Sequence, residues 1–283
     1  MKAAAEEMVP KANLSGRNLS GVQISNADLE SIKLDRAILS GATLSSVFLH
    51  GADMEGVILD GADCSESDFT YISMPKASAA GTNFHGAVMV NTDLRSTNLT
   101  GAVLRRAKLR GADLSGAELS GADLRDADLR DTKLHDTVLS GALLQGANLA
   151  NASIQTANCN GATFSKARLE KTSFVGSSLV GAKFVGALFK DTLFDDADLL
   201  RADFRGTDLR ATQGIRHLSI QRRNYVSDTD NKFRDISMFS VVLGGEIMVS
   251  YKDFWGIAEA LNTGDYVVDD EDLDIVAMLV SFI

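Results

Sequence analysis

The chain has 283 residues, with 28 Lys and Arg against 38 Asp and Glu, and a formal net charge of −10 at pH 7. This length is enough for one or two domains with a substantial core, and the negative charge disfavours a direct nucleic-acid binder. The first residues, MKAAAEEMVPK, lack the apolar run of a signal peptide, no segment reaches the roughly 18 apolar residues of a membrane span, and only two cysteines occur. We therefore expect a reduced, cytoplasmic protein, although delivery as an effector would leave no recognisable leader.

Residues 1–11 precede the regular part of the chain and are predicted to form an N-terminal cap. Within them, the segment from Ala3 to Met8 is expected to fold as a short helix over the first coil of the structure that follows.

Residues 12–213 form a repeat with a period of five. From Leu14 to Leu209, every fifth residue is central to one of 40 repeats, and these positions hold 24 Leu, 8 Phe, 3 Met, 2 Ile, both Cys and one Ala. Two residues earlier stand 24 Ala and 8 Thr. A period of five fits neither a helix nor a half-buried strand. Each repeat is therefore predicted to direct one large and one small side chain inward and then to turn a corner.

The spacing of the glycines indicates how many corners complete one coil. Glycine recurs at intervals of 20 from Gly21 to Gly181, whereas the alternate series, starting at residue 31, has glycine only at Gly51 and Gly111. Four repeats per coil follow, so the predicted fold is an all-β solenoid of about ten square coils. Stacked at about 4.8 Å per coil, they would form a rod roughly 48 Å long.

The repeats "GADLSGAELSGADLRDADLR" (111–130) and "RADFRGTDLR" (201–210) resemble the A(D/N)LXX unit of the pentapeptide-repeat family. The resemblance covers residues 12–213 and implies a right-handed quadrilateral β-helix. It implies no single function, because one branch of the family is similar to DNA and protects or inhibits DNA gyrase, another supplies bacterial regulatory interaction proteins, and a third includes secreted effectors. Pro75 and Ala79 depart from the regular pattern, which predicts one weakened coil.

No residue pattern in the chain indicates catalysis, a cofactor or a metal. Cys64 and Cys159 occupy central, inward positions, and His50, His85 and His135 stand on three different faces of the square. The many Asp residues are spaced by the repeat and line no pocket. We therefore predict that the protein is not an enzyme.

Two outward surfaces are candidates for binding a protein partner. One face has the glycine series, few charges and scattered apolar residues, and it either packs on a partner or a second copy or simply tolerates glycine. On another face, successive coils are expected to bring together a cluster of exposed apolar residues, which either forms a partner groove or is covered by flanking segments. The residues of this cluster are Phe48, Tyr71, Val88 and Val90.

Charged residues on the rod are expected to neutralise one another. Arg105, Arg110, Arg125 and Arg130 stack near several Asp residues, and residues 12–213 as a whole have a net charge of only −4. This near balance favours a non-enzymatic interaction or regulatory scaffold over the alternative, a DNA-mimicking modulator of DNA gyrase or another topoisomerase.

Residues 214–283 break the frame and have a net charge of −6. Residues 215–235 are expected to be a loop with short structure, and residues 239–250 one or two strands around Gly244-Gly245. Helical spacing follows in 251–264, which contains Phe254 and Trp255, with a second acidic helix start near residue 269. This small α/β or helical region, with one or two helices, is expected to cap the rod, with dimerisation or partner recognition as the alternatives.

Overall fold

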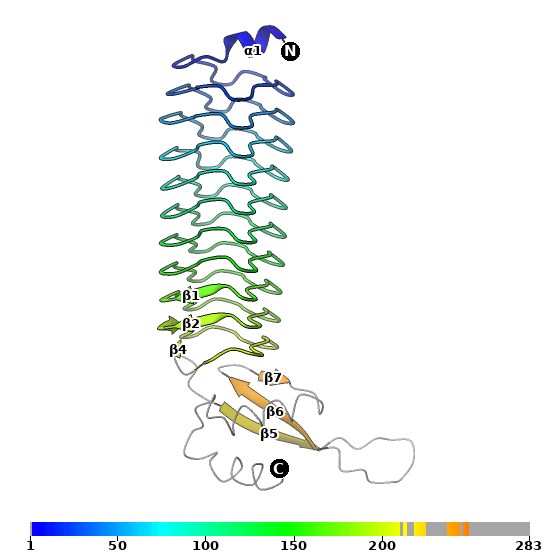
Figure 1. Ribbon diagram of the computed structural model, residues 1–283. Helices are drawn as coiled ribbons and strands as arrows, with labels where there is room; N and C mark the ends of the chain where they lie inside the picture. The colour runs from blue at the N-terminus through cyan, green and yellow to red at the C-terminus, as the bar shows by residue number, and fades with distance from the viewer. Residues whose placement is uncertain (1, 210–211, 214–217, 225–236, 244–245, 249–283) are drawn as a thin grey trace, which may run out of the picture.

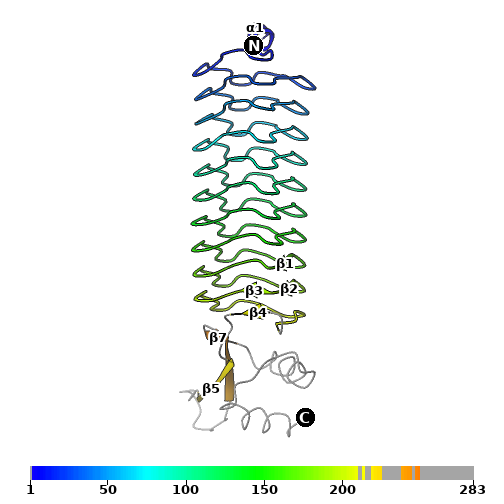
Figure 2. The same cartoon turned by 90° about the vertical axis from the view of Figure 1, so that its left-hand side faces the viewer.

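A computed structural model describes residues 2–209, 212–213, 218–224, 237–243 and 246–248. The chain begins with helix α1 (Lys2–Glu7) and continues as a straight stack of square coils, seen from two perpendicular directions in Figures 1 and 2. The period-five frame of the sequence is therefore the frame of the coils.

Each coil pairs with the next in parallel at an offset of 20 residues. The bridges begin with Asn13 and Lys33 and continue in four columns to Lys183 and Asp203. Where they lengthen into strands the offset is the same, because β1 (Arg168–Glu170) pairs with β2 (Leu188–Lys190), and β3 (Thr192–Leu193) with β4 (Thr212–Gln213). This offset confirms four repeats per coil.

Backbone hydrogen bonds between coils follow one rule along the rod. The amide of a central residue donates to the next coil along the chain, as Leu94 N–H does to the Asp113 carbonyl at 2.8 Å. The amide one residue earlier donates to the preceding coil, as Asp93 N–H does to the Ile72 carbonyl at 2.9 Å. Strand backbones that would otherwise be unpaired are satisfied in this way by both neighbouring coils.

The corners have a left-handed backbone conformation at every fifth residue from Lys11 to Gly206. Many corners close with a bond like that from Ala87 N–H to the Phe84 carbonyl, which gives a turn whose third residue requires a positive φ. Glycine adopts this φ without strain, yet Tyr71 (59°) and Arg106 (58°) adopt it as well. The stack therefore imposes the corner conformation, whatever residue occupies it.

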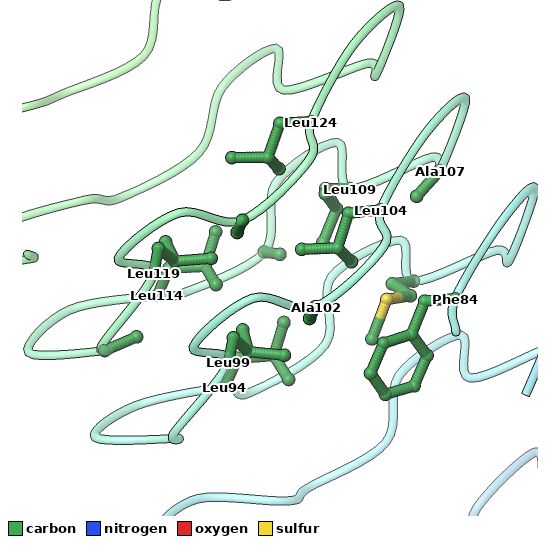
Figure 3. Packing of buried hydrophobic residues seen from close by; sticks show 14 of the residues in the cluster. Phe84, Leu94, Leu99, Ala102, Leu104, Ala107, Leu109, Leu114, Leu119 and Leu124 are labelled. Carbon is green, nitrogen blue, oxygen red and sulfur yellow. The ribbon is translucent and has the colours of Figure 1, made fainter. Parts of the chain in front are cut away.

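The core consists of columns of large side chains separated by small ones. Figure 3 shows Leu104 below Leu124, with Ala102 and Ala107 leaving room between the columns. Toward the end of the rod the columns become aromatic, and Phe184 stacks on Phe204 with ring centroids 4.9 Å apart. A buried side chain of this kind contributes on the order of 1.5–3 kcal/mol.

The coil expected to be weakened at Pro75 and Ala79 keeps its backbone pairing. The Pro75 carbonyl accepts from Gly56 N–H at 3.0 Å, and Ala79 N–H donates to the Asn98 carbonyl at 2.8 Å. Ala79 is fully buried. A small central residue therefore does not interrupt the ladder.

The two ends of the chain contain the remaining elements. At the N-terminus Met8 is buried after α1, and Glu7 pairs with Arg17 of the first coil at 2.9 Å. Near the C-terminus, β5 (Leu218–Asn224), β6 (Ser237–Leu243) and β7 (Glu246–Met248) form an antiparallel sheet in the order β5-β6-β7. The strands expected within 239–250 are confirmed, β5 lies where mostly loop was expected, and the helices expected after residue 250 lie outside the described residues.

Two buried serines repair corners that lack the usual turn bond. The Ser67 hydroxyl donates to the Leu44 carbonyl in the preceding coil and accepts from the Val47 N–H at 3.1 Å. It therefore connects the carbonyl and the amide that bind each other directly at other corners. Ser177 does the same for Ile154 and Ala157. The buried threonines do not have this bridging role, because the carbonyl that accepts from the threonine hydroxyl often also accepts the usual N–H of the turn.

We predict that Ser67→Ala lowers the free energy of unfolding by about 1–3 kcal/mol, because it leaves a buried donor and a buried acceptor unpaired. Thr82→Val is the control, since the Leu59 carbonyl that Thr82 binds keeps its bond from Ala62 N–H. Denaturant unfolding followed by circular dichroism measures both. An equal loss for the two variants would contradict the bridging role of the serine.

Candidate interaction surfaces

The rod has four outward faces, which we number by the central residues of one coil. Faces 1 to 4 contain Leu94, Leu99, Leu104 and Leu109 respectively, together with the positions 20 residues apart from each. On every face the residues just before and just after the central one point outward, because the central side chain is buried. Two columns of side chains therefore make up each face, and faces 2 and 4 lie on opposite sides of the square.

Face 4 presents an exposed aromatic pair near the N-terminal end. Phe48 is 58% exposed and Tyr71, at the adjoining corner, is 64% exposed. The Tyr71 ring meets the His50 ring edge-on, with centroids 6.4 Å apart and planes at 87°. An aromatic surface with two polar edges, the phenol and the imidazole, is typical of protein-binding sites.

The expected four-residue cluster is only partly formed. The corner of Tyr71 adjoins the coil of Val90, since Tyr71 N–H donates to the Val90 carbonyl at 3.0 Å. Phe48 and Val88 are not neighbours, because Asp68 bridges to both and stands between them in the column. Val88 and Val90 are half-buried, so the exposed surface is the aromatic pair rather than a groove of four residues.

Two residues of this face were missed in the sequence. His50 stands on the same strand as Phe48, two positions away, and that spacing was the available signal. Leu188 in β2 lies in the same column near the other end of the rod and is 63% exposed. The predicted interaction residues Phe254 and Trp255 lie outside the described residues.

Faces 1, 3 and 4 contain carboxylate–guanidinium pairs within a single repeat. In the sequence Asp-Leu-Arg, Arg125 binds Asp123 through two bonds, Nε to Oδ1 at 2.8 Å and Nη2 to Oδ2 at 2.6 Å. The pairs Arg95–Asp93, Arg130–Asp128 and Arg205–Asp203 repeat this geometry. The hydrogen bond from Arg125 holds the pKa of Asp123 below its usual range, against the opposing effect of desolvation.

Further pairs join neighbouring coils and complete the neutralisation expected from the sequence. Arg105 lies 3.4 Å from Asp123, and Arg110 Nε donates to Asp131 at 2.9 Å. All four of the arginines named for this cluster therefore have a carboxylate partner. Asp131 also accepts from Asn151, and both bonds lower its pKa.

Face 1 has one pair of carboxyl groups in contact. The hydrogen bond between Asp53 and Asp35 raises the pKa of Asp53 and lowers that of Asp35, which also accepts from Ser15 at 2.9 Å. Burial adds to the increase for Asp53. The two groups therefore share a proton more readily than separate carboxylates would.

Face 2 has the fewest charges of the four faces, and it is followed by the corner that contains the glycine series from Gly21 to Gly181. A Cβ built on any of the glycines from Gly41 to Gly181 in this series would meet no atom within 4 Å. Local packing therefore leaves room for a side chain there, and many positions of the other three corners do have a side chain. The outward apolar residues of the face are half-buried between polar ones.

Cys64 and Cys159 lie in the core as free thiols, as expected. Desolvation raises the pKa of Cys159 to about 12 and that of Cys64 further, so both stay protonated at neutral pH. Among the described residues, no three His, Cys, Asp or Glu side chains are grouped so that they could hold a metal ion. None of the helices in that part of the chain is long and apolar enough to cross a membrane.

The model of the family "Pentapeptide repeats" matches residues 23–61, 62–101, 97–136, 132–171 and 172–210. The chain belongs to the pentapeptide-repeat family. Members of this family fold as right-handed quadrilateral β-helices, in agreement with the square coils described above, and they are typically structural or interaction proteins.

Solved structures of other pentapeptide-repeat proteins are similar to parts of the chain. HetL, involved in heterocyst differentiation regulation in the cyanobacterium Nostoc sp. strain PCC 7120, is 31% identical, with 71% of this chain and 88% of HetL covered and a TM-score of 0.33. QnrB1, a plasmid-mediated fluoroquinolone resistance protein, is 16% identical over 69% of this chain and 87% of its own, also with a TM-score of 0.33. A protein from the Arabidopsis thaliana thylakoid lumen is 27% identical over 42% of this chain and 72% of its own, with a TM-score of 0.12. None of the curated proteins matches the chain in sequence.

On this pentapeptide-repeat rod, replacing a carboxylate that has a raised pKa and replacing one that has a lowered pKa should change the free energy of unfolding in opposite directions. Asp53→Asn should increase the free energy of unfolding at pH 7, because it removes a carboxylate whose raised pKa marks an unfavourable charge. The gain should vanish as the pH falls through the folded-state pKa of Asp53, where the wild-type group is already protonated.

Asp93→Asn should lower stability at pH 7 by up to about 1 kcal/mol, since the lowered pKa of Asp93 reflects its favourable pair with Arg95. That contribution is present above the ordinary Asp pKa of about 4 and is lost as the pH falls through the lower folded-state value. Denaturant titrations at pH 7 and pH 4 compare the two variants. The same sign for both at pH 7 would contradict the assigned environments.

Proposed function

We propose that the protein is a non-enzymatic interaction scaffold that presents a rod face to a protein partner. The observation that carries this proposal is the exposed pair Phe48 and Tyr71 on face 4. Within residues 5–209 these are the only exposed Phe, Tyr or Trp side chains, and the other exposed large apolar residues there are Val9 and Leu188. Aromatic residues dominate the energy of many interfaces, so exposing two of them on a fixed support favours recognition.

The support beneath the pair is well suited to this role. Phe48 N–H donates to the Ala27 carbonyl at 2.9 Å, and Tyr71 is tied to the coil of Val90. Because each side chain stands on a backbone bonded to a neighbouring coil, little conformational freedom is lost when a partner binds. The polar edges of His50 and Tyr71 give the partner directional hydrogen bonds beside the apolar contact.

The finer organisation of the chain completes the proposal. We place an N-terminal cap at residues 1–11, about ten coils in residues 12–213, and a capping or recognition region at residues 214–283. The buried Met8 and the Glu7–Arg17 pair support the first of these assignments. In the C-terminal region, Phe254 and Trp255 are proposed to add specificity for the partner.

A DNA-mimicking modulator of gyrase or topoisomerase is the second candidate. Such a protein needs a surface of unpaired acids that stands in for phosphates. On this rod many carboxylates are bound to arginines, on faces 1, 3 and 4, which weakens any acidic stripe. We therefore rank the mimic below the scaffold.

Affinity capture with the full-length chain tests the proposal. The wild-type protein is compared with the double variant Phe48→Ser/Tyr71→Ser and with Leu188→Ser, a control that removes an equally exposed apolar residue from the same face. A partner retained by the wild type and the control, with at least tenfold less on the double variant, is the expected result.

Equal retention by all three baits would exclude the aromatic pair as the site. Loss of the partner only with Phe254→Ala/Trp255→Ala would move recognition to the C-terminal region. Retention of gyrase or topoisomerase IV, together with inhibition of DNA supercoiling by the purified protein, would establish the alternative function.

A further inference from the structure

Face 2 has four asparagines in its two outward columns, whereas each of the other faces has one. The side chains of Asn18, Asn98, Asn158 and Asn160 each accept hydrogen bonds from their own rod through Oδ1. Asn98, for example, accepts from the Thr100 N–H at 3.1 Å and from the Thr100 hydroxyl at 2.7 Å. None of the four amide Nδ2 groups has an acceptor among the described residues. Four amide donors are therefore available on one face.

The only acids in the two outward columns of face 2 show the opposite pattern. Asp60 Oδ1 accepts from the Ser78 hydroxyl at 2.7 Å and from Ala80 N–H at 2.9 Å, Glu118 accepts from Ser120, and Asp198 accepts from Leu200 N–H. The second oxygen of each carboxylate has no donor among the described residues. The face therefore has three free carboxylate acceptors and four free amide donors.

These donors and acceptors are related by a single symmetry operation. We consider a second rod that lies antiparallel on face 2, with the two-fold axis parallel to the strands and between the coils of Asn98 and Glu118. Each outward column of one rod then lies against the same column of the other rod, which runs in the opposite direction. Glu118 then meets Asn98 of the second copy, and the pairs Asp60 with Asn160 and Asp198 with Asn18 form in the same register. Asn158 faces Ile58 of the second copy and is the one asparagine of the face without a carboxylate partner. At the rim, Lys76 faces Asp136, and both are exposed.

Other arrangements lack this match. With the rods parallel, Asp60 would face Ile58 and Asp198 would face Leu200, which would bury carboxylates against apolar side chains. Shifting the antiparallel register by one coil toward the C-terminus would place Glu118 on Glu118. The register with full overlap is the one that gives every acid of the face an amide partner.

The dimensions of the face are sufficient for a stable dimer. Nine parallel bridges connect Asn18 to Asp198, which gives a length of about 43 Å at about 4.8 Å per coil. With five residues per side, the width is at most about 16 Å, so each rod would bury about 700 Å² and the pair about 1,400 Å², within the standard range for specific interfaces. The glycine corner adds no side chain that would hold the two faces apart.

We propose that face 2 is a self-association surface through which two copies of this chain pack antiparallel about a central two-fold axis. This inference does not depend on the proposed partner site, since Phe48 and Tyr71 lie on the opposite face and remain exposed in the dimer. The surface is mostly polar, with half-buried Ile38, Ile58, Val138 and Val180 between the amide and carboxylate pairs.

The test is the oligomeric state of the full-length protein, measured by sedimentation equilibrium from low micromolar to 100 µM concentrations. The wild type should be a dimer, and Asn98→Asp should weaken its dissociation constant at least tenfold, because four carboxylates then meet at the centre. Asn148→Asp is the control, because Asn148 occupies the same repeat position on face 4 and also accepts from the amide two residues on. A monomeric wild type, or equal affinities for the two variants, would overturn the proposal.

Cross-linking then tests the direction of packing. Ser40 of one rod faces Val180 of the other in the antiparallel dimer, so oxidation of a mixture of Ser40→Cys and Val180→Cys proteins should give a disulfide-linked dimer that neither variant gives alone. The native thiols are buried and do not interfere. In parallel rods Ser40 would face Ile38, so a cross-link in a mixture of Ser40→Cys and Ile38→Cys proteins would indicate parallel packing. No cross-link in either mixture would place the dimer contact on another surface, and both results would overturn the proposal.

Discussion

The inter-coil hydrogen-bond ladder is the constraint on which the rest of this structure depends. Each coil donates backbone hydrogen bonds to the next and to the preceding coil along the chain, so the chain must return to the same lateral position after 20 residues. A corner is required every five residues, and the positive φ at each corner follows from that requirement. Tyr71 and Arg106 adopt a conformation that is costly for them by about 1–2 kcal/mol because the ladder on both sides outweighs the cost.

The ladder also decides which side chains can meet. A residue has neighbours two positions away on its own strand and 20 away in the next coils, and few others. Arg125 and Asp123 are two positions apart on one strand, whereas Ser67 binds Val47, which lies 20 residues earlier at a corner of the preceding coil. Polar groups that are satisfied along these two directions are bound to the rod itself. The groups left over, such as the Asn98 amide, are the ones that can bind another molecule.

Most of the fold could be predicted from the sequence because the inward positions are periodic and nearly uniform. The burial of Cys64 and Cys159 and the four-sided coil follow from that pattern. The strands within residues 239–250 lie outside the repeat and were predicted from the apolar segments on either side of Gly244-Gly245. The surface was harder to predict. Placing Phe48 beside Val88 overlooked Asp68, which the same 20-residue arithmetic puts between them, and the contact of Asp53 with Asp35 depends on side-chain rotamers that spacing does not determine. Strand β5 was missed because its polar sequence, QRRN, resembles a loop.

The separation of interior from exterior has a functional consequence. Two of every five positions build the core, so the outward positions change without altering the fold, and opposite faces can acquire different tasks. On this rod the aromatic pair lies on face 4 and the complementary amides and carboxylates on face 2. If two copies pack through face 2 in antiparallel orientation, the aromatic pairs point away from each other near opposite ends of the assembly. A single rod would present one partner site, whereas the dimer would present two that face in opposite directions, and binding two partners at once would raise the avidity of the scaffold without any new contact.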